Sequence, residues 1–86
     1  MRVSVKKDDP GYANYRPGQR SFLNGDEVTF RCFTADEDRG EVHVYKLSER
    51  GLPYYDAEKD EVPWEILRGD VRIVLNEFVN GVEIIS

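Results

Sequence analysis

Residues 24–47 read NGDEVTFRCFTADEDRGEVHVYKL, and this stretch decides the fold. Two runs of alternating apolar and polar residues, 27–34 and 41–47, flank a polar turn at 35–40. Successive side chains of a strand point to opposite faces, and Asp and Gly tolerate the backbone angles of tight turns. The stretch therefore predicts a β-hairpin.

The alternation assigns the side chains of this hairpin to two faces. One face carries Val28, Phe30 and Cys32 against Val42 and Val44. The other face carries Thr29, Arg31, Phe33, His43, Tyr45 and Leu47. The first face is apolar throughout, so we expect it to pack on the core.

The rest of the chain continues the β pattern. We expect strands at 2–6, with Val3 and Val5 facing inward, at 64–66, at 71–75 and at 82–86, and hairpin turns at 24–25 and 80–81. Segment 8–21 contains Pro10 and Pro17 and predicts a long loop without regular structure. Residues 54–55 predict a short strand, and 56–67 leaves room for one short helix. The predicted fold is a single all-β domain over 1–86, a small antiparallel barrel or sandwich of five to seven short strands.

Composition limits the function classes. The 86 residues suit one domain, and the net charge is −5. The charge is uneven: residues 1–35 carry six basic and four acidic side chains, whereas 36–86 carry six and thirteen. Overall acidity argues against direct nucleic-acid binding, because that binding relies on Lys and Arg. The uneven charge could instead let copies of the chain associate.

Targeting and redox signals are few. No apolar run has the length of a membrane span, and the first residues lack the apolar centre of a signal peptide. We therefore expect no membrane partner. A single cysteine cannot form an internal disulfide, which suits a reducing compartment.

Cys32 and His43 are the only cysteine and the only histidine, and a thiolate–imidazole pair is a known nucleophilic arrangement. A hairpin that folds symmetrically about Asp38 places Cys32 opposite Val44 and His43 opposite Phe33. The two side chains then point to opposite faces. The sequence thus predicts a buried core cysteine and no catalytic residues.

Metal and cofactor motifs are equally weak. Asp56, Glu58 and Asp60 resemble the start of an EF-hand loop, but Glu61 stands where glycine is needed and Leu67 where the bidentate glutamate is needed. We find no glycine-rich phosphate loop and no zinc spacing. The prediction is no metal site and no cofactor.

Aromatic residues divide into a predicted core and a predicted contact surface. Phe30, Phe33, Trp64 and Phe78 are assigned to the core, with Tyr45 half-buried. Tyr and Arg are enriched in protein interface hot spots. We therefore assign a protein-contact surface to Tyr12, Tyr15, Arg16, Arg20, Tyr54 and Tyr55.

The central stretch also carries a family resemblance. Asn24-Gly25 with Val28, then Cys32 with Ala35-Asp36, then Gly40 with Val42 and Tyr45, resembles a pattern in small uncharacterised proteins of tailed phages and prophages. The likeness covers about half the chain and implies a viral accessory protein. It implies no activity and no site residues.

These observations lead to two functional hypotheses. The first is a non-enzymatic phage accessory protein, a virion or morphogenesis component, that acts by protein–protein contact or self-association in the virion or the host cytoplasm. The alternative is an acidic inhibitor that imitates nucleic acid toward a host nucleic-acid-binding protein. Its acidic patch would comprise Asp36, Glu37, Asp38, Asp56, Glu58, Asp60 and Glu61.

Overall fold

The structure is a computed structural model that describes residues 1–79 and 82–85, with side chains through Leu75. The described elements are β1 (Arg2–Ser4), the 3₁₀ helix η1 (Pro10–Asn14), β2 (Arg20–Leu23), β3 (Asp26–Glu27), β4 (Cys32–Asp36), β5 (Glu41–Tyr45), β6 (Trp64–Arg68), β7 (Val71–Val74), β8 (Asn76–Val79) and β9 (Val82–Ile85).

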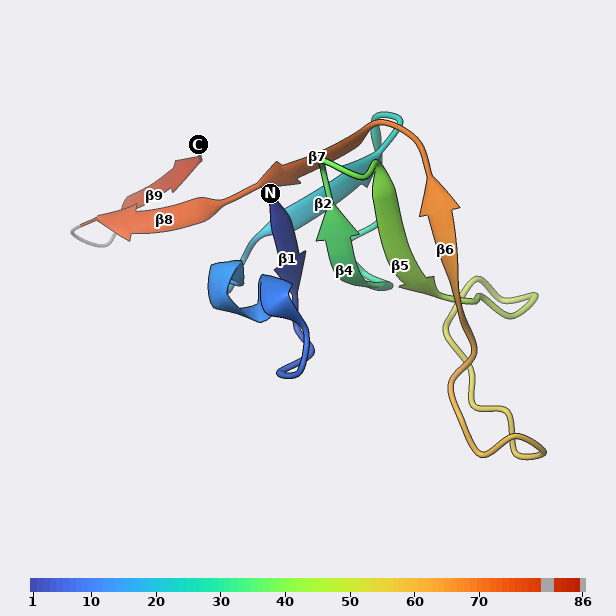
Figure 1. The fold of residues 1–86 in the computed structure, drawn as a ribbon. Coiled ribbons are helices and arrows are strands. Elements are labelled where there is room, and N and C mark those ends of the chain that lie inside the picture. The colour runs from blue at the N-terminus through green and yellow to red at the C-terminus, as the bar shows by residue number, and fades with distance from the viewer. Residues whose placement is uncertain (80–81, 86) are drawn as a thin grey trace.

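Two antiparallel sheets account for seven of these strands (Figure 1). The first sheet has the order β1-β4-β5-β6, and the second has the order β3-β2-β7 and crosses over one end of the first. Strands β8 and β9 pair with each other and extend away beyond β7. The predicted all-β antiparallel fold is confirmed: the sheets do not close into a barrel, and a small sandwich describes them best.

The core lies between the two sheets. Val3, Ala35, Val42 and Val44 come from the first sheet, and all four are essentially inaccessible to solvent. Val28 and Val71 complete the buried cluster, with Leu23, Cys32, Leu67 and Ile73 packed around it. The inward positions of Val28, Cys32, Val42 and Val44 are those that the alternation predicted.

The turn at Asn24-Gly25 forms as predicted. Both residues have positive φ, +52° and +86°, which suits the two-residue turn between β2 and β3. Asn24 also joins this turn to the next one in space: its Oδ1 accepts a 2.9 Å hydrogen bond from the Asp70 N–H, and its own N–H donates to the Asp70 carbonyl. The sequence alone did not predict this second role.

The predicted long strand 27–34 is interrupted, and this corrects one core assignment. A turn over 28–31, closed by the hydrogen bond from Arg31 N–H to the Val28 carbonyl, separates β3 from β4. The turn breaks the alternation, so Phe30 is 64% exposed and does not lie in the core.

The N-terminal expectations need two further corrections. Strand β1 ends at Ser4 and Val5 is exposed, whereas Ser4 is buried and its hydroxyl is satisfied by a 2.8 Å hydrogen bond with the Thr34 hydroxyl. Segment 8–21 is not entirely irregular, because Pro10–Asn14 forms η1 and packs along β1. Pro10 suits the first helical turn, and the Asp9 carboxylate caps the helix by accepting from the Gly11 N–H.

The helix that 56–67 left possible does not form. Asp56 and Glu61 instead bridge each other as in a hairpin, and β6 starts at Trp64. Tyr54-Tyr55 forms no strand, although Leu47 and Pro53 make an isolated bridge. The predicted turn at 80–81 and the Phe78 side chain lie outside what the structure describes. Among the described residues no helix is long and apolar enough to cross a membrane.

Candidate functional site: an aromatic hollow on the outer sheet face

The register of the first sheet sorts its outer face into three rows. Arg2, Asp36, Glu41 and Arg68 form a charged row; Ser4, Thr34, His43 and Ile66 form a middle row; Tyr45 and Trp64 form an aromatic row. A register shift between Cys32 and Thr34 adds Phe33 to the aromatic row. The face therefore changes from charged to aromatic along the strands.

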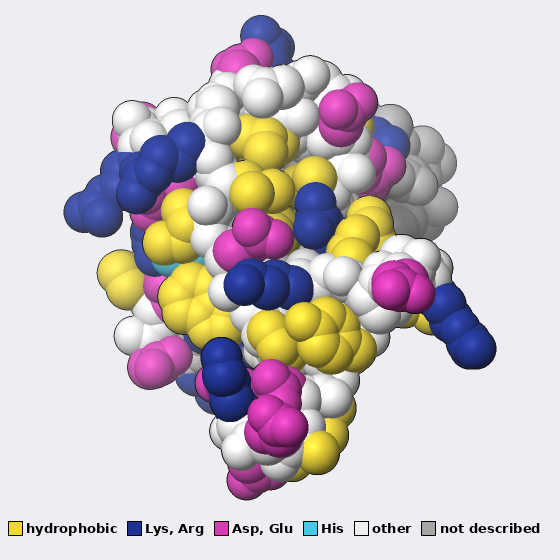
Figure 2. Space-filling model, turned by 90° about the vertical axis from the view of Figure 1, so that its right-hand side faces the viewer, with side chains coloured by type: hydrophobic (Ala, Val, Ile, Leu, Met, Phe, Trp, Pro, Cys, Tyr) yellow, Lys and Arg dark blue, Asp and Glu magenta, His cyan; other side chains and the backbone are white. Residues whose placement is uncertain are grey.

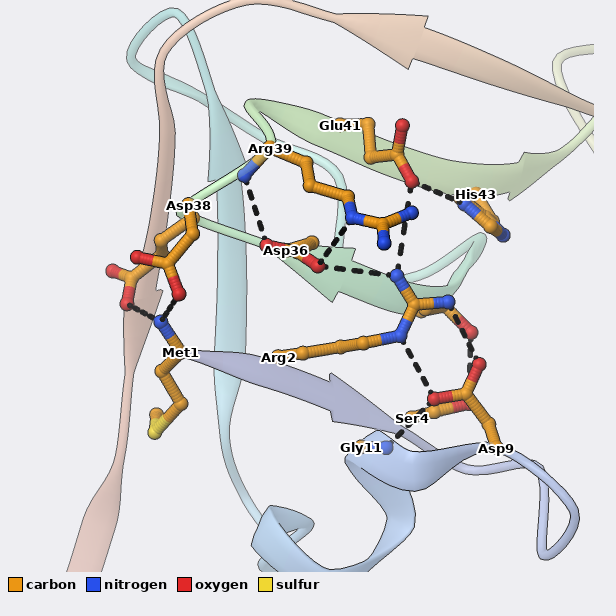
Figure 3. Close-up of polar contacts among 12 residues, drawn as sticks. Met1, Arg2, Ser4, Asp9, Gly11, Asp36, Asp38, Arg39, Glu41 and His43 are labelled. Atoms are coloured by element: carbon orange, nitrogen blue, oxygen red, sulfur yellow. Dashed lines mark hydrogen bonds and ion pairs between the residues drawn. The ribbon is translucent and has the colours of Figure 1, made fainter.

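Arg2 organises the charged row (Figure 3). Its Nε and Nη2 donate to the two carboxylate oxygens of Asp9 at 2.9 and 2.8 Å, and its Nη1 donates to Asp36 at 3.2 Å. The hydrogen bond from Arg2 lowers the pKa of Asp9 to about 2. Burial acts to raise the pKa of Asp36, but hydrogen bonds from the Arg39 backbone N–H and from Arg2 outweigh it and lower that pKa.

Glu41 extends this network across β5. Its carboxylate lies 3.3 Å from His43 Nε2 and accepts a 3.1 Å hydrogen bond from Arg68. The hydrogen bond with His43 is the main reason that the pKa of Glu41 is lowered. Each carboxylate of the row thus has a cation beside it, so removal of one partner would leave a buried charge uncompensated.

The aromatic row forms one cluster around Phe33. The Phe33 ring lies 4.9 Å from the Tyr45 ring and 5.6 Å from Trp64, edge to face in the second case. His43 stacks on Trp64 at 5.7 Å and meets the edge of Phe33. Such pairs are favourable beyond the area they bury, so the rings hold one another in place.

Much of this cluster remains open to solvent. Phe33 is buried, but Trp64 is 49% exposed and Ile66 is 40% exposed. Figure 2 views the side on which β6 lies and shows hydrophobic side chains across its middle with charged side chains between and below them. Phe33 is buried as predicted, although it lies on the outer face of the sheet. The predicted core position of Trp64 is wrong, because Trp64 lies on the edge strand β6, on the outer face beside Tyr45 of β5.

The rings line a hollow of about 560 Å³. Its lining consists of Lys6, Asp8, Phe33, Tyr45, Glu61, Val62 and Trp64. The Lys6 ammonium lies 5.0 Å from the centre of the Phe33 ring and 5.9 Å from that of Tyr45, which is cation–π range. The lining holds two carboxylates, Asp8 and Glu61, and one ammonium group, Lys6, so it carries one excess negative charge.

Cys32 and His43 lie on opposite faces of the sheet, as predicted. Cys32 pairs with Val44, also as predicted, but the register shift makes Thr34 the partner of His43 instead of Phe33. Burial raises the pKa of the Cys32 thiol, and its Sγ donates to the Thr34 carbonyl. A buried thiol of raised pKa is a poor nucleophile. The His43 imidazole lies on the other face of the sheet, so it cannot act as a base toward this thiol.

The predicted Tyr/Arg surface is divided among the segment along β1, strand β2 of the second sheet and the segment before β6. Tyr12, Tyr15 and Arg16 lie on or beside η1 along β1, and Arg20 is partly buried on β2 against the Phe22 ring. Tyr54 and Tyr55 are exposed in the segment that leads to β6, at the other edge. The structure therefore does not bring these six residues together.

The predicted acidic patch is also divided. Asp36, Glu37 and Asp38 lie where β4 ends, and all three contact basic groups or backbone donors: Asp36 contacts Arg2, and Glu37 and Asp38 contact the N-terminal ammonium. Asp56, Glu58, Asp60 and Glu61 lie beyond the opposite end of β5. Asp60 accepts a hydrogen bond from the Tyr55 hydroxyl.

Sequence reasoning missed the aromatic hollow as a site. The alternation did place Phe33, His43 and Tyr45 on one face, but it could not show that Trp64 joins them, because strand order is not encoded in any local pattern. Among the described residues no group of His, Cys, Asp and Glu is placed to hold a metal ion. Comparison with protein-family models, with curated proteins and with solved structures found no match to this chain.

Proposed function

We propose that the protein is a non-enzymatic binding protein that contacts a segment of another protein through the aromatic hollow. The observation that carries this proposal is the open Trp64 beside Tyr45 and Phe33, with Asp8 and Glu61 at the rim. Trp and Tyr are the residues that most often dominate protein interfaces. The phage resemblance adds the proposal that the partner belongs to a virion or to its assembly.

The rim points to a basic residue in the bound segment. A Lys or Arg side chain could lie against exposed aromatic surface and reach the carboxylates of Asp8 and Glu61. Lys6, which already lies over Phe33 and Tyr45, illustrates that these rings accept an ammonium group. We therefore expect binding to weaken as salt is raised.

A displayed library of random peptides tests this proposal without knowledge of the natural partner. Peptides selected on the protein should be enriched in Lys or Arg beside apolar residues, and their binding should change the fluorescence of Trp64, the only tryptophan. Asp8→Lys should weaken these peptides by about tenfold, and Trp64→Ala by about thirtyfold. Asp26→Lys, a charge reversal at another exposed aspartate, on β3, is the matched control and should change nothing.

Two results would contradict the proposal. One is a set of peptides whose affinity for Trp64→Ala equals their affinity for the original chain. The other is a set whose binding depends on Tyr15 and Arg16, which would assign the contact to η1 and its flank instead. If the selected peptides instead require Glu58 and Asp60 for binding, the result would favour the alternative in which the protein imitates nucleic acid.

A further inference from the structure

Among the strands that the structure describes, none pairs with the outer edge of β6, so one edge of the first sheet is open. Strand β6 is the last strand in the order β1-β4-β5-β6, whereas the other edge, β1, is flanked by η1. The side-chain amide of Asn14, in η1, also donates a hydrogen bond to the backbone carbonyl of Arg2 on β1. An open edge is a template for a further strand, so β6 is the place where the sheet can grow.

The register shows which backbone groups face outward. Lys46 N–H donates to the Pro63 carbonyl, and Gly69 N–H donates to the Gly40 carbonyl. Hydrogen-bonded positions alternate along an antiparallel pair, so Glu65 and Leu67 also bond to β5. The N–H and C=O groups of Trp64, Ile66 and Arg68 consequently point away from the sheet.

We propose that β6 pairs with β6 of a second copy of this chain, antiparallel about a two-fold axis through Ile66. This register brings Trp64 opposite Arg68 of the second copy and Ile66 opposite its own counterpart. All three outward-facing residues then form hydrogen-bonded pairs, about six backbone hydrogen bonds in total. No like charges face each other, since Glu65 lies opposite Leu67.

The side chains of the outer face complement one another in this register. Trp64 and Ile66 are about half exposed, and the Arg68 side chain is 69% exposed, so each has surface left to bury. Arg68 of one copy would lie over the aromatic row of the other, where an arginine–indole contact is favourable. The pairing would thus cover the apolar surface seen along this edge (Figure 2).

Charge is complementary at the two ends of β6 as well. The segment before β6 holds Asp56, Glu58, Asp60 and Glu61 against a single Lys59. The other end of β6 lies near three largely exposed arginines, Arg39, Arg68 and Arg72, although Asp70 pairs with the last of them. Antiparallel pairing directs the acidic segment of each copy toward the end of the other that holds these arginines, whereas a parallel pairing would place the two acidic segments side by side.

Such a pair would have eight strands in one continuous sheet, with both aromatic hollows on the same face. The pairing does not depend on the binding function proposed above, because it is argued from the open edge of β6 and from the contact between Trp64 and Arg68 of the second copy. The interface is small and should exchange with monomer at accessible concentrations.

Cross-linking through position 66 tests the pairing. Residues opposite each other in a hydrogen-bonded pair have Cα atoms about 5.5 Å apart, which a disulfide can span. In a Cys32→Ala background, Ile66→Cys should form a disulfide-linked dimer under mild oxidation. Ala13→Cys, exposed on η1 at the opposite edge, is the matched control and should remain largely monomeric.

Sedimentation velocity on chains that keep Cys32 provides a second test. From micromolar to near-millimolar concentration the original chain and Ile66→Val should shift from monomer to dimer, whereas Ile66→Lys should remain monomeric because it places two ammonium groups opposite each other. Monomer at every concentration, or cross-linking of Ala13→Cys as fast as Ile66→Cys, would overturn the proposal. Asp8→Lys should leave the dimer intact while it weakens the selected peptides, so the two proposals can fail separately.

Discussion

At the scale of single residues, Arg2 is the side chain on which the most polar contacts depend. It satisfies both oxygens of Asp9 and one of Asp36, and both carboxylates are largely buried. Removal of one partner from a buried pair leaves an uncompensated charge. Arg2→Ala should therefore lower the free energy of unfolding by roughly 3 kcal/mol in urea denaturation.

Arg72 is the matched control for this prediction, because it also pairs with an aspartate, Asp70, but both side chains are mostly exposed. Arg72→Ala should cost less than about 1 kcal/mol. Equal losses from the two substitutions would contradict the assignment of Arg2 as a buried anchor.

The lowered pKa of Asp9 predicts how stability depends on acid. Its pKa of about 2 in the folded chain lies below that of an ordinary aspartate, about 3.9, so the unfolded chain takes up this proton first. The stabilisation is complete above about pH 4 and is lost as the pH falls to about 2. Asp9→Asn should flatten the decrease in unfolding free energy across this window, as followed by denaturation at several pH values; an unchanged slope would contradict it.

At the scale of elements, the tight turns at the end of the first sheet depend on close backbone contact. Gly40 has a φ of +62°, and a Cβ there would lie 2.8 Å from the carbonyl oxygen of Gly69. Gly51 has a similar φ of +78° but open space around it. Substitution of these two glycines therefore separates two costs in stability: that of placing a side chain at positive φ, and that of a steric clash with a neighbouring backbone.

Alanine at each glycine should show this difference. Gly51→Ala should cost about 1–2 kcal/mol, the penalty for a side chain in the left-handed region. Gly40→Ala should cost clearly more, because the Gly69 backbone must also move. Equal midpoints of thermal or urea unfolding would show that the contact between the 35–40 turn and Gly69 is not tight.

Element prediction from sequence succeeded where the signal is local and failed where it is not. Asn24-Gly25 specifies its own turn, and the valines of β5 alternate without interruption, so both were predictable. The register shift at Phe33 and the turn that exposes Phe30 have no such local signature. Trp64 was misplaced for a different reason, since its exposure follows from β6 being an edge strand.

At the scale of the whole molecule, Glu37 connects the two sheets. It follows β4 of the first sheet, and its carboxylate accepts a 3.1 Å hydrogen bond from the Ile73 N–H on β7 of the second. That N–H faces away from β2, so the carboxylate satisfies a backbone donor at a sheet edge. The connection adds to a core of small side chains that is modest in size.

Loss of this connection should weaken the whole fold. Glu37→Ala should lower the free energy of unfolding by roughly 1.5 kcal/mol, the usual contribution of a hydrogen bond to a charged group. Asp38→Ala is the control, because Asp38 is 87% exposed, and it should change stability by less than about 0.5 kcal/mol. A larger loss at Asp38 than at Glu37 would contradict this role.

The central claim is that the outer edge of β6 is an interaction surface, and residue-resolved amide hydrogen exchange tests it most directly. At low concentration the amides of Glu65 and Leu67 should be protected, whereas those of Trp64, Ile66 and Arg68 should exchange freely. At high concentration the three outward amides should become protected as well, and Ile66→Lys should abolish that gain. If these amides exchange equally fast at every concentration, or are already protected in the dilute monomer, the account of β6 as an open edge that pairs is wrong.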